Sequence, residues 1–283
     1  MSVKIIVDST SDLTPEVARQ VKTVPLTIHF GEKQYVSGVD IDSKKFYEML
    51  VESDVLPTTS QPTPYAFSQV FQEVVDAGDT AVCLTVSSKL SGTYQSASIA
   101  AEEFPGKIFV VDTLTVAIGG GILAEYALQL ANSGMEAEEL ARELLAQRQK
   151  VRVLALVDTL EYLKKGGRIS STVAFAGGLL NIKPVISVTD GEVKMMGKAR
   201  GSKQGNNLLV QEIQKSGGVD FAKPLMLGYT GLSDALLQKY IADSAALWEG
   251  QVETLPVSIV SSVVGTHVGP GAVAVAFFAR NAG

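Results

Sequence analysis

The residues best placed to do chemistry lie in polar loops, and the clearest of these loops spans residues 87–94, Ser-Ser-Lys-Leu-Ser-Gly-Thr-Tyr. The loop follows the apolar run Ala81 to Val86 and opens a predicted helix. Backbone N–H groups at a helix start carry partial positive charge and bind anions. The Ser91 hydroxyl adds a donor there, and Gly92 permits close approach, which suits a carboxylate or phosphate. Taken alone, the loop favours a plain serine N-cap.

Three further loops carry polar side chains at predicted strand or helix ends. One is hydroxyl-rich and includes Thr59 and Ser60. The second spans 264–271, where His267 stands among glycines and a proline, so we expect a tightly turned backbone there. A purely structural turn is an equal alternative. The third ends a helix at Gly166-Gly167, where lysines favour the helix dipole but Arg168 is left unexplained.

Several classes of catalytic or metal site are excluded or disfavoured. The chain has no G-x-x-x-x-G-K-[ST] phosphate loop and no G-x-S-x-G nucleophile turn. Its two histidines, His29 and His267, are far apart in sequence, and Cys83 is the single cysteine, so we expect no metal site and no disulfide. We expect no cofactor.

Charge is unevenly distributed along the chain. The net charge is −6, which disfavours nucleic acid as a partner. Residues 150–203 nevertheless contain ten Lys and Arg against four Asp and Glu, a local charge of +6. Such a surface indicates an anionic ligand or partner, although an ordinary solvated face explains it equally well.

The termini and apolar runs indicate a cytoplasmic protein with no stable membrane insertion. The N-terminus turns acidic at Asp8, too early for a signal peptide. No apolar run reaches the roughly 18 residues that a membrane helix needs.

The first half alternates predicted strands and helices, which favours a mostly parallel sheet covered on both faces. We expect strands at 3–7, 24–30, 81–86, 108–111 and 153–157. We expect helices at 14–20, 46–51, 63–74, 92–104, 116–132 and 136–149. Thr14-Pro15 and Thr63-Pro64 each have the pattern of an N-cap followed by a first-turn proline.

The second half is predicted to be α+β with an antiparallel sheet. Asp190-Gly191 separates two strand-like runs, 184–188 and 192–197, and is a strong hairpin signal. Helices are expected at 205–214 and 233–247, and strands at 225–229, 252–257 and 272–278. The fold class is therefore α/β, with domains at 1–155 and 156–283 and the ligand between them.

Taken together, these loops resemble the DegV family of bacterial fatty-acid-binding proteins, in register along essentially the whole chain. The segments that carry the resemblance are residues 8–13 (DSTSDL), 24–26 (VPL), 59–62 (TSQP), 90–97 (LSGTYQSA), 112–113 (DT), 160–169 (LEYLKKGGRI), 183–184 (KP), 198–201 (KARG) and 265–271 (GTHVGPG).

The resemblance implies a long-chain fatty acid with a buried tail, bound by a protein that is not itself an enzyme. Ser91 and Gly92 would contact the carboxylate, with Thr59 or Ser60 beside them, and His267 would complete the head-group site. A separate fatty acid kinase would phosphorylate the bound acid to an acyl-phosphate for phospholipid synthesis.

For the rim and the tail, the expectations are less direct. By the same resemblance, Arg168 and Arg200 would face the kinase. Candidate tail-lining residues are Phe175, Leu179 and Ile182, for which ordinary core positions are an equal alternative.

Other functions stay open on the sequence alone. Ser91 and His267 could form a nucleophile–base pair, although no acid at suggestive spacing supports it. The chain could instead carry a small carbonyl substrate for a partner kinase, or be a regulatory module whose lipid is structural.

Overall fold

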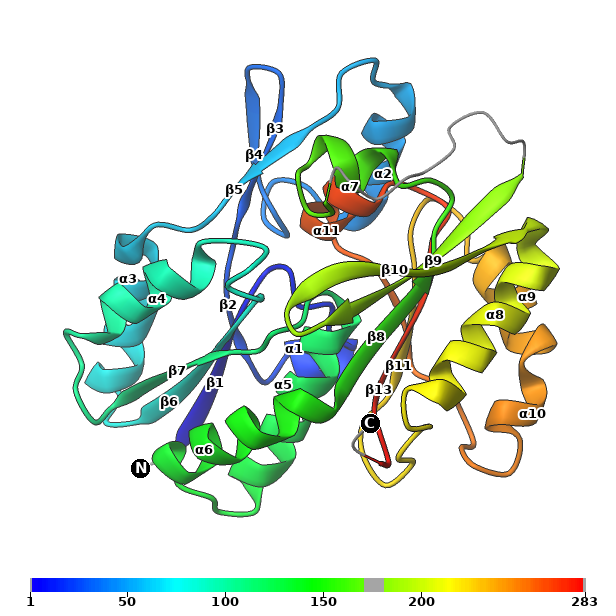
Figure 1. Ribbon diagram of the computed structural model, residues 1–283. Helices are drawn as coiled ribbons and strands as arrows, with labels where there is room; N and C mark the ends of the chain where they lie inside the picture. Colours follow the sequence, from blue (N-terminus) through cyan, green and yellow to red (C-terminus); the bar gives the residue numbers. More distant parts are fainter. Residues whose placement is uncertain (1, 171–180, 282–283) are drawn as a thin grey trace.

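The computed structural model describes residues 2–170 and 181–281. Within these residues the chain forms two large sheets and one small sheet, with helices between and outside them (Figure 1). The first large sheet is parallel and the second is mainly antiparallel. The predicted α/β class is confirmed.

The first sheet has the strand order β2-β1-β6-β7, and each neighbouring pair is parallel. Its strands are β1 (Val3–Asp8), β2 (Lys22–Val24), β6 (Thr80–Thr85) and β7 (Ile108–Asp112). Every residue of β6 is buried, as expected for a parallel strand covered on both faces. Helices α3 (Pro64–Asp76) and α4 (Thr93–Ala101) pack on one face, and α5 (Ile118–Asn132) and α6 (Ala137–Gln147) on the other.

The second sheet has the order β10-β9-β8-β13-β11-β12. Neighbouring strands of this sheet are antiparallel, except for β11 and β12, which are parallel. The strands are β8 (Val151–Leu156), β9 (Ile182–Thr189), β10 (Glu192–Arg200), β11 (Met226–Tyr229), β12 (Val257–Ile259) and β13 (Val273–Phe278). Its outer face is covered by α8 (Gly201–Lys215), α9 (Ala235–Asp243) and α10 (Ala245–Trp248).

The two large sheets share one core. Helices α5 and α6 lie between them, and a single apolar cluster runs from Ile5 and Val82 of the first sheet, through Leu123, to Ala274 of the second. The layers therefore run from α3 and α4 through the first sheet, α5 and α6, and the second sheet to α8 and α9. The relative position of the sheets is thus set by buried apolar contact.

A small antiparallel sheet of β3 (Thr27–Phe30), β4 (Lys33–Val36) and β5 (Thr58–Ser60) projects from the top of the molecule in Figure 1. Beside it lie α2 (Ser43–Glu52), α7 (Glu161–Lys165) and α11 (Ser262–Val268). The remaining helix, α1 (Pro15–Ala18), follows β1.

Local signals in the sequence are confirmed. The Thr14 and Thr63 hydroxyls accept hydrogen bonds from the N–H groups of Val17 and Ala66, so both residues cap their helices. Asp190 and Gly191 both have positive φ, as a two-residue type I′ hairpin requires.

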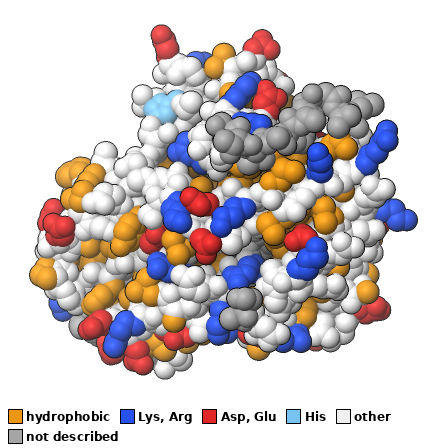
Figure 2. All heavy atoms as spheres, viewed as in Figure 1, with side chains coloured by type: hydrophobic (Ala, Val, Ile, Leu, Met, Phe, Trp, Pro, Cys, Tyr) orange, Lys and Arg blue, Asp and Glu red, His pale blue; other side chains and the backbone are white. Residues whose placement is uncertain are grey.

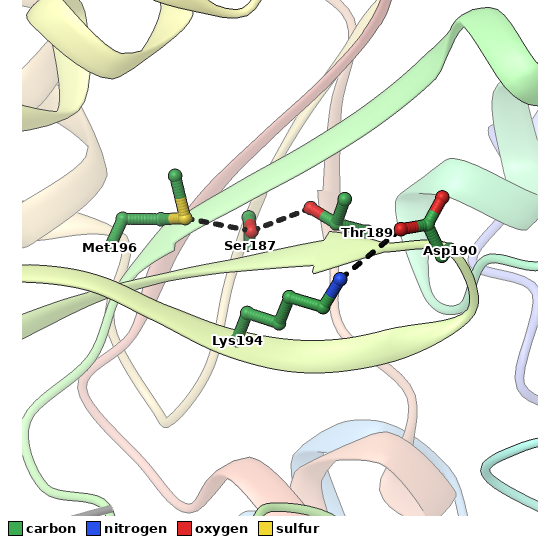
Figure 3. A network of polar contacts seen from close by, with 5 residues as sticks. All are labelled: Ser187, Thr189, Asp190, Lys194 and Met196. Carbon is green, nitrogen blue, oxygen red and sulfur yellow. Dashed lines mark hydrogen bonds and ion pairs between the residues drawn. The ribbon is translucent and has the colours of Figure 1, made fainter.

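The hairpin of β9 and β10 carries its own polar network (Figure 3). The Ser187 hydroxyl lies 2.8 Å from that of Thr189 and donates to the Met196 sulfur at 3.1 Å, while Lys194 pairs with Asp190 at 3.2 Å. The pairing register shifts between Met195 and Gly197, which makes Met196 the extra residue of a β-bulge.

Most predicted elements differ by a few residues at their ends, and three others divide or shift along the chain. The strand predicted at 24–30 is two strands of different sheets, because Pro25 lacks the N–H that a continuous ladder needs. The helix predicted at 233–247 divides at Ser244 into α9 and α10. The strand predicted at 252–257 lies further along the chain, at Val257–Ile259, as β12.

The predicted division at residue 155 falls within β8. Because β8 pairs with β9 and β13, sheet membership places it with the C-terminal strands and not with the first sheet. A domain boundary just before Val151 would agree with the strand pairing. Among residues 2–170 and 181–281, no helix is both long and apolar enough to cross a membrane.

Candidate functional site

A cavity with an accessible volume of about 70 Å³, partly open to solvent, lies at the carboxyl edge of the first sheet. The cavity adjoins the loops after β1 and β6, where chain connections diverge and open α/β sheets commonly bind ligands. Among the described residues its lining is nine Val and Leu side chains and five polar ones, which are Thr10, Thr59, Ser91, Arg168 and His267.

His267 lies on the last turn of helix α11, so the expected tight turn is wrong for residues 264–268, whereas Gly269 and Gly271, both with positive φ, follow the helix. Gly265, one of the glycines that suggested a turn, is helical. A Cβ there would lie 2.6 Å from the Tyr47 hydroxyl and 2.8 Å from the Phe46 ring, so glycine lets α11 approach α2 closely. The helix ends at Gly269, whose φ of +75° favours glycine.

The imidazole of His267 is neutral at physiological pH. Burial, with a smaller contribution from the Arg168 charge, lowers the pKa of His267 to about 4. Its Nε2 lies 2.9 Å from the Thr59 hydroxyl, and within the described chain its buried Nδ1 has no hydrogen-bond partner. A buried N–H without a partner is costlier than a bare lone pair, which favours the tautomer whose Nε2–H donates to Thr59.

Ser91 lies in the cavity lining just before α4. Its hydroxyl is 2.9 Å from that of Thr93 and accepts the Thr93 N–H at 3.3 Å, so part of its bonding is that of a helix cap. Gly92 is not part of the lining. A Cβ on Gly92 would collide with the Gln61 side chain, whose amide donates to the Gly92 carbonyl at 3.2 Å. The group that approaches Gly92 closely is therefore the Gln61 side chain.

The structure separates Thr59 from Ser60. Successive residues of a strand point to opposite faces. Thr59 faces the cavity and His267, whereas exposed Ser60 hydrogen-bonds His29 Nε2 at 2.7 Å and does not line the cavity.

Arg168 lines the cavity and also an adjoining groove. Its Nε donates to the Leu90 carbonyl at 3.1 Å and its Nη1 to the Gly166 carbonyl at 2.5 Å. The groove, which also carries Lys89, Lys194 and Glu192, shares Leu90, Arg168 and Val193 with the cavity. We call it the basic groove.

Arg200, in contrast, is exposed at the end of β10 and outside the cavity lining. Figure 2 shows Lys and Arg side chains gathered over the part of the surface where Figure 1 places the β9–β10 hairpin and α8. The basic segment seen in the sequence is thus a surface feature beside the cavity.

Sequence reasoning missed Thr10 as a cavity residue. Buried Asp8 accepts the Thr10 hydroxyl at 2.6 Å, the Thr10 N–H at 2.9 Å and the Val86 N–H at 2.7 Å. Burial raises the pKa of Asp8, and these hydrogen bonds partly offset the rise. Asp8 therefore ties together the loops after the two central strands. The position of Thr10, directly after a predicted buried strand, was the available signal.

The apolar lining was also missed. Phe175 and Leu179 lie outside the described residues, and Ile182 does not line the cavity. The lining includes Val263, Val264 and Val268, which share a helix with His267. Their spacing would have revealed this face only if residues 262–268 had been recognised as helical.

The arrangement suits binding better than covalent catalysis. Within the described chain Ser91 and His267 do not hydrogen-bond each other: the Ser91 hydroxyl pairs with Thr93, and His267 Nε2 pairs with Thr59. Nor do the residues that the structure describes contain a cluster of three or more His, Cys, Asp or Glu that could hold a metal.

The fold and the site define a two-sheet α/β protein whose apolar cavity carries one set of polar side chains. The chain belongs to the DegV family, whose model matches residues 2–280. A DegV domain-containing protein of Deinococcus radiodurans is 36% identical, with 98% of each chain covered.

Solved structures agree in fold. A DegV family protein from Thermus thermophilus, described for its fatty acid binding, is 33% identical with a TM-score of 0.86, covering 98% of this chain and all of that one. A stearic acid-binding protein from Eubacterium ventriosum is 28% identical with a TM-score of 0.84, covering 98% and 97%.

Proposed function

We propose that this protein binds a long-chain fatty acid, with the tail among the Val and Leu side chains and the carboxylate toward Thr59, Ser91 and His267. The observation that carries the proposal is that polar side chains from separate chain segments meet in an otherwise apolar cavity. Burying the tail contributes about 0.8 kcal/mol per CH₂. The fatty acids bound by DegV relatives support the assignment.

The carboxylate needs several donors, because a desolvated charge is stable only when hydrogen-bonded. With His267 Nε2–H donating to Thr59, the Thr59 hydroxyl hydrogen is free to donate to the ligand. Ser91 offers a second hydroxyl. Arg168, whose Nε and Nη1 donate to the carbonyls of Leu90 and Gly166, brings a positive charge to the same site.

We further propose that the bound acid is presented to a separate kinase in the cytoplasm. On the kinase, a carboxylate oxygen of the fatty acid would attack the γ-phosphorus of ATP, giving an acyl-phosphate for phospholipid synthesis and releasing ADP. The basic groove supports this step, since it joins the cavity at Arg168 and its charge suits an approaching phosphate. No cofactor of this chain is required.

Native mass spectrometry with lipid extraction tests binding directly. We expect one fatty acid per chain, in purified protein or after addition of the acid. Thr59→Val should weaken binding about tenfold, equal to about 1.4 kcal/mol, whereas the neighbouring control Ser60→Ala should not. A chain that takes up no fatty acid under either condition contradicts the proposal.

Charge reversal at Arg200 tests partner docking. Arg200→Glu should slow acyl-phosphate formation by a fatty acid kinase while leaving fatty acid affinity unchanged. Arg142→Glu, on the exposed face of α6, is the matched control and should change neither. Loss of fatty acid binding in Arg200→Glu would refute its partner-facing role.

A further inference from the structure

Asp12 is a buried carboxylate that joins two separate parts of the molecule. Its side chain is 3% exposed, and Oδ1 accepts the N–H of Ser261 at 2.7 Å. Ser261 is the residue that precedes helix α11. The Ser261 hydroxyl lies near the same carboxylate, but the geometry between them falls short of a hydrogen bond. In the described chain, neither the Ser261 hydroxyl nor Asp12 Oδ2 has a hydrogen-bond partner.

The backbone of Asp12 is held firmly on the other side. Its N–H donates to the Ala117 carbonyl at 3.1 Å, just before α5. A Cβ on Gly121 would lie 1.9 Å from the Asp12 carbonyl oxygen, so α5 packs directly against this backbone. Asp12 is thus fixed to the first sheet's loop and to α5, while its side chain extends to α11.

Helix α11 is the element most in need of such a contact. It has only seven residues, yet it supplies His267 and three of the cavity valines, Val263, Val264 and Val268. In so short a helix, the position of the first residue largely sets the position of the last. We propose that Asp12 is a positioning residue for ligand binding, which holds the start of α11 so that His267 meets Thr59. This inference rests on the proposed function.

The surroundings of Asp12 make its charge sensitive to pH. The titratable group that faces it is Tyr47 of α2, and no Lys, Arg or His in the described chain forms an ion pair with it. Burial raises the pKa of Asp12 to about 7, against the lowering effect of Ser261. Near neutral pH the contact at the start of α11 therefore changes between a neutral and a charge-assisted hydrogen bond.

Binding of a fluorescent fatty acid measures the positioning. We expect Asp12→Ala to weaken binding about tenfold. Asp12→Asn should bind within about twofold of wild type, because its amide oxygen still accepts the Ser261 N–H. The matched control is Asp42→Ala. It removes a carboxylate that caps α2 by accepting the Lys45 N–H at 2.7 Å, and α2 supplies no residue to the cavity lining. The affinity of this variant for the fatty acid should be unchanged. Wild-type affinity in Asp12→Ala would overturn the proposal.

An NMR titration tests the same inference without ligand. The chain has two histidines, so the His267 ring signals are assigned in His29→Gln protein. Because the pKa of His267 is about 4, its own titration is complete above pH 6. We expect an inflection near pH 7 in its ring shifts that disappears in Asp12→Asn. A flat wild-type profile would overturn the inference. Absence of fatty acid binding together with this inflection would refute only the proposed function.

Discussion

The two walls of the cavity are built by different kinds of interaction. The wall from the first sheet consists of loops held by buried hydrogen bonds, with Asp8 linking Thr10 to Val86. The wall from α7 and α11, beyond the Asp12 contact at the start of α11, is held by close packing at glycines: Gly166 lies against His267, Gly265 against Tyr47 and Gly269 against Tyr162.

This difference predicts different sensitivities. Hydrogen-bonded loops depend on having an acceptor for each donor, so a near-isosteric change of chemistry should disturb them. Packed helices depend on volume, so one added methyl group should disturb them. Three substitutions and one change of pH distinguish the two walls.

Gly265→Ala should have the largest effect. The new Cβ would lie within 3 Å of Tyr47 and Phe46, two buried side chains of α2 that cannot move away easily. We expect a loss of about 3 kcal/mol in the free energy of unfolding, measured with urea. Gly31 has a positive φ, but open space surrounds the position of its Cβ. Gly31→Ala should therefore lose only about 1 kcal/mol in the free energy of unfolding. Equal losses would show that packing at α11 is not special.

Asp8→Asn tests the hydrogen-bonded wall. The amide nitrogen cannot accept, so at least one of the three donors from Thr10 and Val86 loses its partner. We expect a loss of about 2 kcal/mol in the free energy of unfolding, together with weaker ligand binding.

The control for Asp8 is Asp112→Asn at the end of β7. That carboxylate accepts from Ser88 and Leu114, which do not line the cavity. It should reduce stability without reducing affinity. Reduced affinity in both variants would mean that loop order in general, and not Thr10, matters for binding.

Gly166→Ala should act on affinity more than on stability. Its Cβ would lie 2.3 Å from His267 Nδ1, and the ring can rotate away, breaking its contact with Thr59. We expect about tenfold weaker fatty acid binding, or about 1.4 kcal/mol. Gly167→Ala is the adjacent control, with positive φ and open space. If Gly167→Ala weakens binding equally, the His267 contact is not the cause.

The smallest expected effect is the pH dependence that His267 contributes. Its pKa is about 4 in the folded protein and 6.5 when unperturbed, so below pH 6.5 the unfolded chain binds more protons. The contribution of uncharged His267 to the free energy of unfolding is therefore complete above pH 6.5 and is lost as the pH falls toward 4. Between pH 8 and 5.5 we expect a loss of about 1 kcal/mol that His267→Gln lacks. Identical pH profiles in urea unfolding would contradict this assignment.

Much of the fold could be predicted from the sequence because the signals are local. The caps at Thr14 and Thr63 act within three residues, and the Asp190-Gly191 hairpin within two. The buried strands of the first sheet were readable as short apolar runs. The β8 strand was equally visible, but its sheet was not, because pairing partners lie far away along the chain.

The site divides in the same way. The residue types available at the site can be read from the chain: hydroxyls at 59, 60 and 91, one histidine at 267 and one arginine at 168. Their partners depend on the fold, which brings Thr59 and not Ser60 to His267 across 208 residues, adds Thr10 to the cavity and uses Gly265 for packing. The physical reason is range: capping and periodicity act within a few residues, whereas a cavity between sheets depends on the burial that brings distant segments together.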